Sequence, residues 1–484
     1  MKKFFEKHDL FKLTGIFVLI AVLLTWLVSS SYFTAGTLSS NGFNRVGLFD
    51  LTTYGLLQIF YFTVVFMFVL VVGGFYKFVG SLEAYDNLTS KIAAKFEGKE
   101  KVLVAISILL FGAATGVSTD YLVLFAIIPF VISILAKLKV DKVTGLVATF
   151  GGILVGILGA TYAPKITGIL ADSTNGLGVS YGFELASTIV LFAVAYLLLT
   201  YFVLARMNKV ASDNKSEAAL LVDPFIIAKV EEKEDKKKGK KDKKKRKISS
   251  VGLAIVLSLV FVVLLLAYIG WEAAFNIKVF ADVTKWIQEA TLFGENVYSY
   301  ILGSSLVAFG EWDLLAGAGL LLFASLVIKF VYHIPFDKML DEYLEGFKVI
   351  IKPLAILMMV YLVLEISIIF PTISYLADKI MGLGNNIGTL FASGALTSLF
   401  AVDFQYTVST VGSVFLTFSN TNVAALILQA AYGLIQFIAP TSAILMLGLA
   451  CLDIKFKDYF KFIWKFALAM LIVIFVVLAI LMYV

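Results

Sequence analysis

The sequence is poor in charged residues, cysteine and histidine. Only 15% of its 484 residues are charged, against about 25% in soluble domains. It has one cysteine, Cys451, and two histidines, His8 and His333, so an intramolecular disulfide is excluded and a cysteine-based metal site is not expected. It contains no Walker A motif, zinc-ligand spacing or nucleophile elbow. Neither an ATP-driven pump nor an enzyme therefore has support in the sequence.

Long hydrophobic runs dominate what is present. Hydrophobic residues make up 60% of the chain and the mean hydropathy is +0.94, which predicts an all-α polytopic membrane protein with about 11 membrane-embedded segments. No convincing small-residue cleavage site follows the first run, residues 11–28, so we expect it to remain as a span. Lysines beside the ends of the runs explain the net charge of +6 through the positive-inside rule, without a nucleic-acid partner.

Two hydrophobic regions are each interrupted by a polar tip that carries an aspartate. Asp120 follows a stretch rich in Gly, Ser and Thr inside residues 102–138, and Asp403 lies in the break FAVDFQYT inside residues 391–418. The flanking apolar runs are short for a span of about 20 residues, so we predict two re-entrant hairpins. A carboxylate inside a membrane is costly and is a functional candidate. The alternative is that each aspartate only caps a helix or lies in a surface loop.

Each hairpin is followed by a hydrophobic segment that a proline interrupts. Pro164 breaks residues 143–170, and Pro440 breaks residues 421–449. Proline frees nearby carbonyl groups from the helical ladder, and those carbonyls could hold a cation; a simple kink is the alternative. Four glycines in the first segment indicate close helix packing; they are Gly151, Gly152, Gly156 and Gly159.

Each half is predicted as span, span, amphipathic segment, hairpin, interrupted segment and span, and the lysines place the two hairpins on opposite sides. Hydropathy predicts the second spans at about residues 54–79 and 353–370, the latter preceded by an inner amphipathic helix at 336–352. This arrangement predicts inverted repeats: residues 1–207, whose hairpin opens to the cytoplasm, and residues 313–484, whose hairpin opens to the exterior. Residues 208–249 are predicted as a Lys-rich cytoplasmic linker, and residues 250–312 as a connecting span with an outer segment. We interpret the basic stretch 236–247 as a solvated linker, with a patch for anionic lipid as the alternative.

Polar residues at the tips and proline breaks form the predicted binding region. Two carboxylates near the middle of a membrane can hold a cationic substrate, a sodium ion or a proton. Lys165 could bind a substrate carboxylate, neutralise Asp120 or extend to the interface. We expect no cofactor, a coupling Na⁺ or H⁺, and no metal site other than one for sodium at the tips. The candidate substrate- and ion-binding residues are Ser118, Thr119, Asp120, Thr161, Pro164, Lys165, Asp403, Gln405, Thr407, Pro440, Thr441 and Ser442.

Several short motifs, in this order along the chain, resemble the YfcC-type transporters. This family is grouped with the C4-dicarboxylate anaerobic carriers in the ion-transporter superfamily. The resemblance extends over nearly the whole chain except the Lys-rich linker. The matching stretches are VGLFD at 46–50, VVGG at 71–74, GKEK at 98–101, Phe336 with Asp337, Glu345 with Gly346, PTS at 440–442, Lys455, and YFK at 459–461.

The resemblance implies an inverted-repeat fold with two re-entrant hairpins, working as a homodimer by an elevator motion. It also implies transport of amino acids, often by exchange of the arginine–ornithine type, with dicarboxylates as the older assignment. This sequence departs from the family at two places. The second tip reads AVDFQY at 401–406 rather than a Pro-, Ser- and Gly-rich run, and Lys165 replaces an uncharged residue. Both departures lie in the binding region.

The sequence therefore predicts a multi-pass secondary active transporter of the plasma membrane. The preferred substrate is an amino acid, cationic ones first because both tips are acidic. The alternative is a small carboxylate or C4-dicarboxylate carried with sodium or protons, with Lys165 as the anion contact. A passive channel needs a continuous polar stripe, whereas polar residues occur here only at discrete breaks.

The lysine distribution predicts a cytoplasmic N-terminus and an external C-terminus. A tag fused to the C-terminus should be labelled by an impermeant reagent in intact cells, and an N-terminal tag should be labelled only after permeabilisation. A protected C-terminal tag would contradict the inverted repeat.

Overall fold

The computed structural model describes residues 9–173, 176–179, 183–212, 220–226, 249–291, 294–303 and 306–483. These residues are almost entirely helical, apart from an antiparallel pair of short strands, β1 (Ser30–Thr34) and β2 (Thr37–Gly42). Within the described residues, eight helices are long and apolar enough to cross a membrane. The chain is an all-α polytopic membrane protein, as its composition predicts.

The first half follows the predicted order of span, span, amphipathic helix, hairpin, interrupted segment and span. Hairpin 1 consists of α6, η1 and α7, and the first interrupted segment runs from α8 to α10. The elements are α2 (Asp9–Leu27), α3 (Leu48–Tyr61), α4 (Thr63–Gly80), α5 (Glu83–Phe96), α6 (Glu100–Val117), η1 (Tyr121–Ala126), α7 (Ile128–Lys137), α8 (Lys142–Leu146), η2 (Val147–Gly151), α9 (Gly152–Leu158), η3 (Pro164–Gly168), α10 (Ile169–Ala171) and α11 (Phe183–Ser212).

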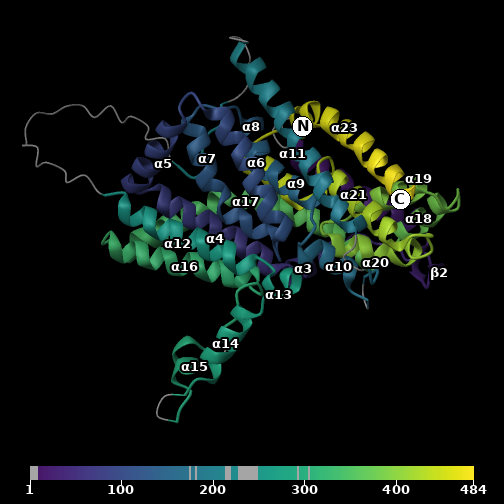
Figure 1. Cartoon of the computed structure of the whole chain (residues 1–484), viewed down its shortest axis with the longest axis horizontal. Helices are drawn as coiled ribbons and strands as arrows, with labels where there is room; N and C mark the ends of the chain where they lie inside the picture. Colours follow the sequence, from purple (N-terminus) through teal and green to yellow (C-terminus); the bar gives the residue numbers. More distant parts are fainter. Residues whose placement is uncertain are drawn as a thin grey trace, which may run out of the picture.

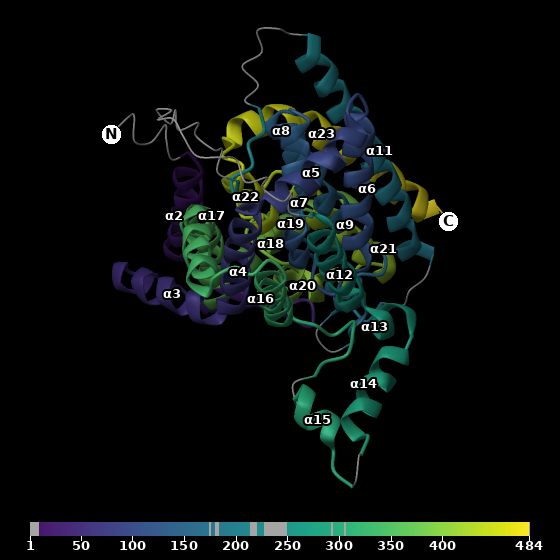
Figure 2. The same ribbon diagram turned by 90° about the vertical axis from the view of Figure 1, so that its left-hand side faces the viewer.

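The second half repeats that order after a connecting region, α12 to α15. In both overall views α14 and α15 project away from the helical body (Figures 1 and 2). Hairpin 2 consists of α19 and α20, and the second interrupted segment of α21 and α22. The elements are α12 (Val251–Tyr268), α13 (Trp271–Phe275), α14 (Val279–Glu289), α15 (Val297–Leu302), α16 (Leu314–Val331), α17 (Phe336–Ile369), α18 (Ile373–Met381), α19 (Ile387–Ser398), α20 (Phe404–Phe415), α21 (Thr421–Gln436), α22 (Ala443–Cys451) and α23 (Phe456–Tyr483).

The second long helices of the two halves, α4 and α17, pack side by side in opposite directions. Phe62, just before α4, stacks on Tyr361 with ring centroids 4.3 Å apart. Further along α4, Gly73 lies against Ile350, which precedes Tyr361 in α17. A side chain at Gly73 would collide with Ile350, so the glycine permits the close approach. Close packing of this kind holds membrane helices together, because lipid tails are as apolar as leucine.

The interrupted segments of the two halves also run antiparallel to each other. Leu158 at the end of α9 packs against Gly433 of α21, where a Cβ would find no room. Gln429, one turn earlier in α21, donates a hydrogen bond from Nε2 to the carbonyl oxygen of Ala160 at 2.6 Å. Corresponding elements that pair in opposite directions are what an inverted repeat requires. The boundaries predicted for the repeats stay a prediction.

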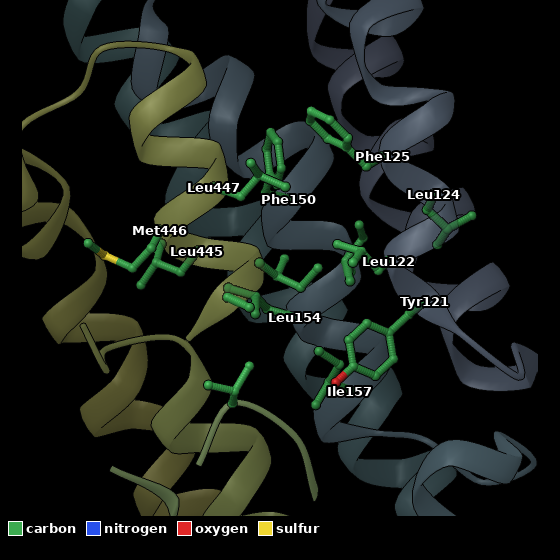
Figure 3. Packing of buried hydrophobic residues seen from close by; sticks show 14 of the residues in the cluster. Tyr121, Leu122, Leu124, Phe125, Phe150, Leu154, Ile157, Leu445, Met446 and Leu447 are labelled. Carbon is green, nitrogen blue, oxygen red and sulfur yellow. The ribbon is translucent and has the colours of Figure 1, made fainter. Parts of the chain in front are cut away.

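The glycines of the first interrupted segment allow hairpin 1 to pack closely on it. Gly152 lies against the backbone of Ile108 and Gly156 against Gly112, both on α6, and neither position leaves room for a Cβ. The core continues through η1, η2 with α9, and α22 (Figure 3). There the rings of Phe125 and Phe150 lie 6.2 Å apart. The predicted role of the glycines in packing is confirmed at these positions.

Two helix boundaries differ from those that hydropathy predicts. Residues 336–352 and 353–370, expected as an inner amphipathic helix and a separate span, form the single helix α17 with Pro353 inside it. Pro353 is buried within the packed helix, and the surrounding contacts offset the hydrogen bond that proline removes. The expected span 54–79 is instead split at Phe62 into α3 and α4, because Phe62 is held in a non-helical conformation against Tyr361.

The first arm of hairpin 1 is longer than the short apolar run in the sequence predicts. Helix α6 has 18 residues, about 27 Å at 1.5 Å per residue. Its tip reaches the last residues of α12, where Gly270 donates a backbone hydrogen bond to Val117 at 3.2 Å. The arms of hairpin 2 have 12 residues each, as short as predicted.

Part of the predicted linker packs onto the first half. Leu221 is buried and donates a backbone hydrogen bond to Val140 at 2.9 Å. Phe225 is also buried, with its ring 6.1 Å from that of Tyr76 on α4. Residues 220–226 of the predicted linker 208–249 are therefore packed on the first half through their apolar side chains. The basic stretch 236–247 lies outside the described residues.

This packed segment, residues 220–226, buries a carboxylate. Asp223 accepts hydrogen bonds from the backbone N–H of Phe225 at 2.8 Å and from the hydroxyl of Ser133. Ser133 also contacts the hydroxyl of Tyr85 at 2.8 Å. Burial raises the pKa of Asp223 above its ordinary value, although these hydrogen bonds act in the opposite direction.

Because the folded protein holds the Asp223 proton more tightly than the unfolded chain does, stability should fall as pH rises through the raised pKa. We expect the melting temperature of purified protein to fall as pH rises above the ordinary Asp pKa of about 3.9. Asp223→Asn should flatten that dependence, since the amide carries no charge. An unchanged pH dependence in the variant would show that Asp223 does not titrate in this range.

Candidate functional site

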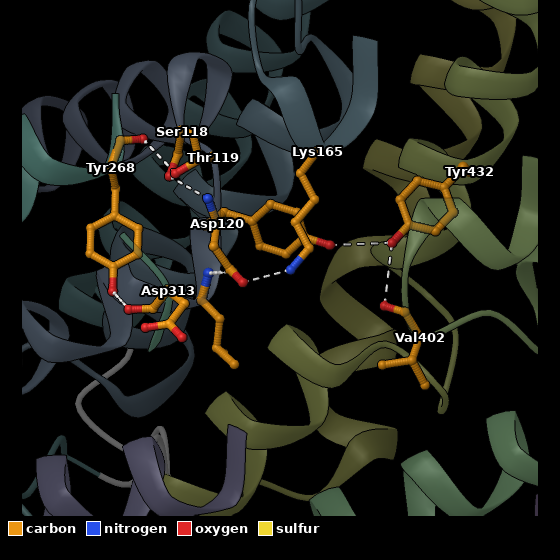
Figure 4. A network of polar contacts seen from close by, with 10 residues as sticks. Ser118, Thr119, Asp120, Lys165, Tyr268, Asp313, Val402 and Tyr432 are labelled. Carbon is orange, nitrogen blue, oxygen red and sulfur yellow. Dashed lines mark hydrogen bonds and ion pairs between the residues drawn. The ribbon is translucent and has the colours of Figure 1, made fainter. Parts of the chain in front are cut away.

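The tip of hairpin 1 is fixed by its own side chains and by the end of α12. Asp120 accepts a hydrogen bond from the backbone N–H of Leu122 at 2.9 Å, and its own N–H donates to Ser118 Oγ at 3.2 Å. Thr119 donates from both its backbone N–H, at 2.7 Å, and its hydroxyl, at 3.2 Å, to the carbonyl oxygen of Tyr268 (Figure 4). Asp120 thus caps η1, as the structural alternative predicts, but capping uses only one carboxylate oxygen.

The other carboxylate oxygen of Asp120 binds Lys165. The distance from Lys165 Nζ to Asp120 Oδ2 is 2.6 Å, and 32% and 19% of the two side chains remain exposed (Figure 4). Lys165 stands at the start of η3, directly after Pro164, which packs against Gly270. Its ammonium also lies 5.5 Å from the ring centre of Tyr121. Of the three roles predicted for Lys165, the geometry shows the pairing with Asp120.

The tip of hairpin 2 carries Asp403 at the N-cap of α20. Its carboxylate accepts a hydrogen bond from the backbone N–H of Tyr406 at 3.0 Å. Asp403 and Asp120 are 283 positions apart in the sequence, but contacts of two tyrosines connect their hairpin tips.

Two tyrosines connect the hairpin tips. The hydroxyls of Tyr121, at the start of η1, and Tyr432, in α21, are 3.4 Å apart. Tyr432 donates to the carbonyl oxygen of Val402 at 3.3 Å, next to Asp403 (Figure 4). Its ring also packs 5.1 Å from that of Phe404. Neither tyrosine was among the predicted site residues, because a Tyr in an apolar run gives no signal that separates packing from a polar contact.

The charges at the meeting point do not cancel. Asp120, Asp403 and Lys165 together leave one net negative charge. Because buried charges are stable only when paired or hydrogen-bonded, a cation or an ammonium group near Asp403 would complete the balance. A carboxylate of a ligand could compete with Asp120 for the ammonium group of Lys165. The cluster can thus interact with both ends of a zwitterion.

The remaining predicted residues support the breaks rather than join the charged cluster. Thr161 contacts the hydroxyl of Thr188 at 2.6 Å. Thr441 donates to the carbonyl oxygen of Leu399 at 2.7 Å and so ties the second break to hairpin 2. Ser442 caps α22, Pro440 is buried beside it, and Gln405 points to an exposed surface.

Within the described residues, six buried side-chain oxygen atoms have no hydrogen-bond partner. Three of them, Thr407 Oγ1, Ser393 Oγ and Gln429 Oε1, lie on the helices of hairpin 2 and the second interrupted segment, and the other three are on Ser30, Gln58 and Thr200. Such atoms are rare in folded proteins, and a bound ion or water is one explanation for them. Sequence reasoning included Thr407 but missed Gln429, a polar residue whose place inside the apolar run of α21 was a usable signal.

A family model named C4-dicarboxylate anaerobic carrier matches residues 62–483. The chain belongs to this family. The matched region covers both hairpins and both interrupted segments, and it confirms the resemblance drawn from the sequence. This member of the family is therefore a membrane transporter.

Two solved structures show a weak likeness to this chain. One is the YdaH transporter of Alcanivorax borkumensis, described as having an unusual topology; the identity is 11%, the TM-score 0.40, and 98% of each chain is covered. Another is MtrF of Neisseria gonorrhoeae, described with a class of antimetabolite efflux pumps; the identity is 11%, the TM-score 0.38, and 98% of this chain and 94% of that one are covered. No curated protein matches this carrier significantly.

The unpaired hydroxyl of Thr407 allows a test of ion binding. Valine has the shape of threonine without the hydroxyl, so Thr407→Val should leave the melting temperature unchanged or higher if that oxygen has no ligand. We expect the variant to keep its fold and to need about tenfold more coupling ion for half-maximal transport, the effect of about 1.4 kcal/mol.

The matched control is Thr89→Val, at a buried threonine of α5 whose hydroxyl bonds within its own helix. Its ion dependence should equal that of the parent. Parental ion dependence in Thr407→Val as well would remove Thr407 from the ion site.

Proposed function

We propose that this carrier moves amino acids, cationic ones preferentially, by exchange or by cotransport with Na⁺ or H⁺. The observation that supports this proposal is the charged cluster where the hairpin tips meet. Its lysine suits a substrate carboxylate, and its unpaired negative charge suits an ammonium or guanidinium group. Discrete polar breaks in an otherwise apolar body favour alternating access over a continuous pore.

In this proposal, the substrate α-carboxylate interacts with Lys165 and the α-amino group with Asp403. The substrate carboxylate then replaces Asp120 as the partner of Lys165. A cationic side chain of the substrate would then bind the carboxylate of Asp120, which no longer pairs with Lys165. Charge-assisted hydrogen bonds contribute about 1.5–3 kcal/mol each, enough to discriminate among substrates by charge.

We infer an elevator motion from how the elements pack. The hairpins lie against the interrupted segments, α6 on α9 and α19 on α21. In a second group, α16 and α17 pack on α4, and α2 packs on α17, which also contacts α22 of the first group. The first group would move with the substrate and the second would stay fixed. A homodimer of the fixed groups, in the plasma membrane, completes the proposal.

A C4-dicarboxylate is the second candidate substrate, supported by the description of the family to which the chain belongs. Lys165 would then be the anion contact. In that case we expect a coupled cation, because the two negative charges of Asp120 and Asp403 exceed the one positive charge of Lys165. Sodium or a proton bound near Asp403 and Thr407 would supply it.

Removal of each tip charge tests the proposal directly. Asn is nearly the size of Asp and can still cap a helix, so Asp120→Asn and Asp403→Asn change the charge with little change in shape. We expect each to lower uptake of arginine or ornithine into proteoliposomes by about tenfold or more, the effect of losing one charge-assisted contact. The pH or sodium dependence of uptake should change as well.

Asp282→Asn is the control. Asp282 is exposed in the first turn of α14, which projects away from the helical body (Figures 1 and 2). It should transport like the parent, as should Asp172→Asn in the loop after α10. Parental transport of every amino acid and dicarboxylate tested by both tip variants would show that the aspartates are only caps. Uptake of succinate but not of amino acids by the parent would select the dicarboxylate candidate.

A further inference from the structure

A separate cavity lies at the opposite end of the interrupted segment from the hairpin tips. Its volume is about 680 Å³, within the range of small-molecule sites. It is open on one side and is lined by the start of α8, the end of α11, the loop before α23 and the first turns of α23. These three helices gather at one end of the body, at the top of Figures 1 and 2.

The lining of this cavity is strongly basic. Six cationic side chains face three acidic ones, a net formal charge of +3. The cationic residues are Lys142, Arg206, Lys209, Lys455, Lys461 and Lys465. Lysines that only follow the positive-inside rule need not enclose a cavity, so this arrangement calls for a ligand.

A buried ion pair forms the fixed wall of the cavity. Asp141, with 3% of its side chain exposed, accepts hydrogen bonds from Arg206 Nε at 3.0 Å and Nη2 at 2.8 Å. The same carboxylate caps α8 by accepting from Val143 N at 3.1 Å. The guanidinium also lies 5.8 Å from the ring centre of Phe462. Arg206 is therefore held in position before any ligand arrives.

The other two carboxylates of the lining are also paired. Asp453 binds Lys352 at 3.1 Å, and Asp458 binds Lys461 at 3.5 Å. Burial opposes ionisation of Asp453, but the hydrogen bond from Lys352 and nearby lysine charges bring its pKa below the ordinary value, so it stays charged and paired. Within the described part of the chain, three lysines of the lining form no salt bridge: Lys142, Lys455 and Lys465.

The surroundings of the cavity indicate where its anion comes from. Helices α11 and α23 are strongly apolar, and most of their length is not covered by the rest of the protein. Leu197 and Tyr201 of α11, and Leu468 and Ile472 of α23, are among their exposed side chains. Trp464 is exposed next to Lys465, as expected where a helix leaves the bilayer. A lipid beside these helices would place its head group at the cavity.

We propose that this cavity binds the phosphate head group of an anionic phospholipid from the adjacent leaflet. Lys142, Lys455 and Lys465 contact the phosphate oxygens, Arg206 supplies a fixed positive wall, and the acyl chains lie on the exposed faces of α11 and α23. The lipid thereby joins α8, which belongs to an interrupted segment, to the two flanking helices.

The test compares purified full-length protein in nanodiscs of phosphatidylcholine with and without phosphatidylglycerol. Phosphatidylglycerol should raise the melting temperature of the parent and should be retained on purification, as counted by mass spectrometry. The triple variant Lys142→Gln/Lys455→Gln/Lys465→Gln should lose most of that shift and retain less lipid, with a parental melting temperature in phosphatidylcholine alone. Should the triple variant be unstable, Lys455→Gln and Lys465→Gln singly give the same readout, each with a smaller loss.

The control is Lys95→Gln/Lys99→Gln/Lys338→Gln, which removes the same charge from exposed positions outside the cavity. It should keep the parental shift. Equal losses in the two triple variants would overturn the proposal, because general surface charge would then explain binding. A shift produced equally by soluble glycerol phosphate in phosphatidylcholine discs would also overturn it, in favour of a free-anion site.

Discussion

The structure depends on satisfying peptide groups where the chain is not helical inside a membrane. Lipid offers no hydrogen-bond partners, so each such group needs one from the protein or from water in a cavity. At the first break, Tyr162 donates to the carbonyl oxygen of Gly116 on hairpin 1, at 3.2 Å. Gln429 of the second half donates to Ala160. The unwound backbone of one half is thus completed partly by the other, and this requirement brings the two halves together at their polar breaks.

The same requirement concentrates the charges. A carboxylate at a hairpin tip can cap its helix with one oxygen, which leaves the other available, and at Asp120 that oxygen binds Lys165. Both side chains of this pair remain partly exposed, so a charged ligand could reach either of them. The same tips are connected through Tyr121 and Tyr432.

The basic cavity beside α8 depends on ion pairs rather than on the hydrogen bonds of unwound backbone. Its wall contains the ion pair of Asp141 with Arg206. The proposed lipid would be bound by lysines of the lining, of which Lys142 also donates to the carbonyl oxygen of Asp453 at 3.4 Å. Because α8 begins the same interrupted segment that carries Lys165 at its break, the two sites are joined by one segment of chain. Close helix contacts at positions such as Gly152 and Gly156 make that segment a firm connection to hairpin 1.

The sequence alone determined much of the fold. Hydropathy and polar breaks located both hairpins and both interrupted segments, because water-free surroundings restrict where polar residues can lie. The aspartates and the proline breaks were found in the same way, and the pairing of Lys165 with Asp120 was one of three predicted options.

Other features were decided only by the tertiary structure. Tyr121 meets Tyr432 across 311 positions, and no local pattern indicates which face of a buried helix will meet a distant one. Residues 220–226 were interpreted as linker, because a short apolar run reveals no docking surface until hairpin 1 has formed one. Pro353 remained inside α17 because packing along a 34-residue helix outweighs the hydrogen bond that a proline removes. Hydropathy indicates whether a segment lies in the membrane or in water, whereas the packing of helices on one another decides which side chains meet.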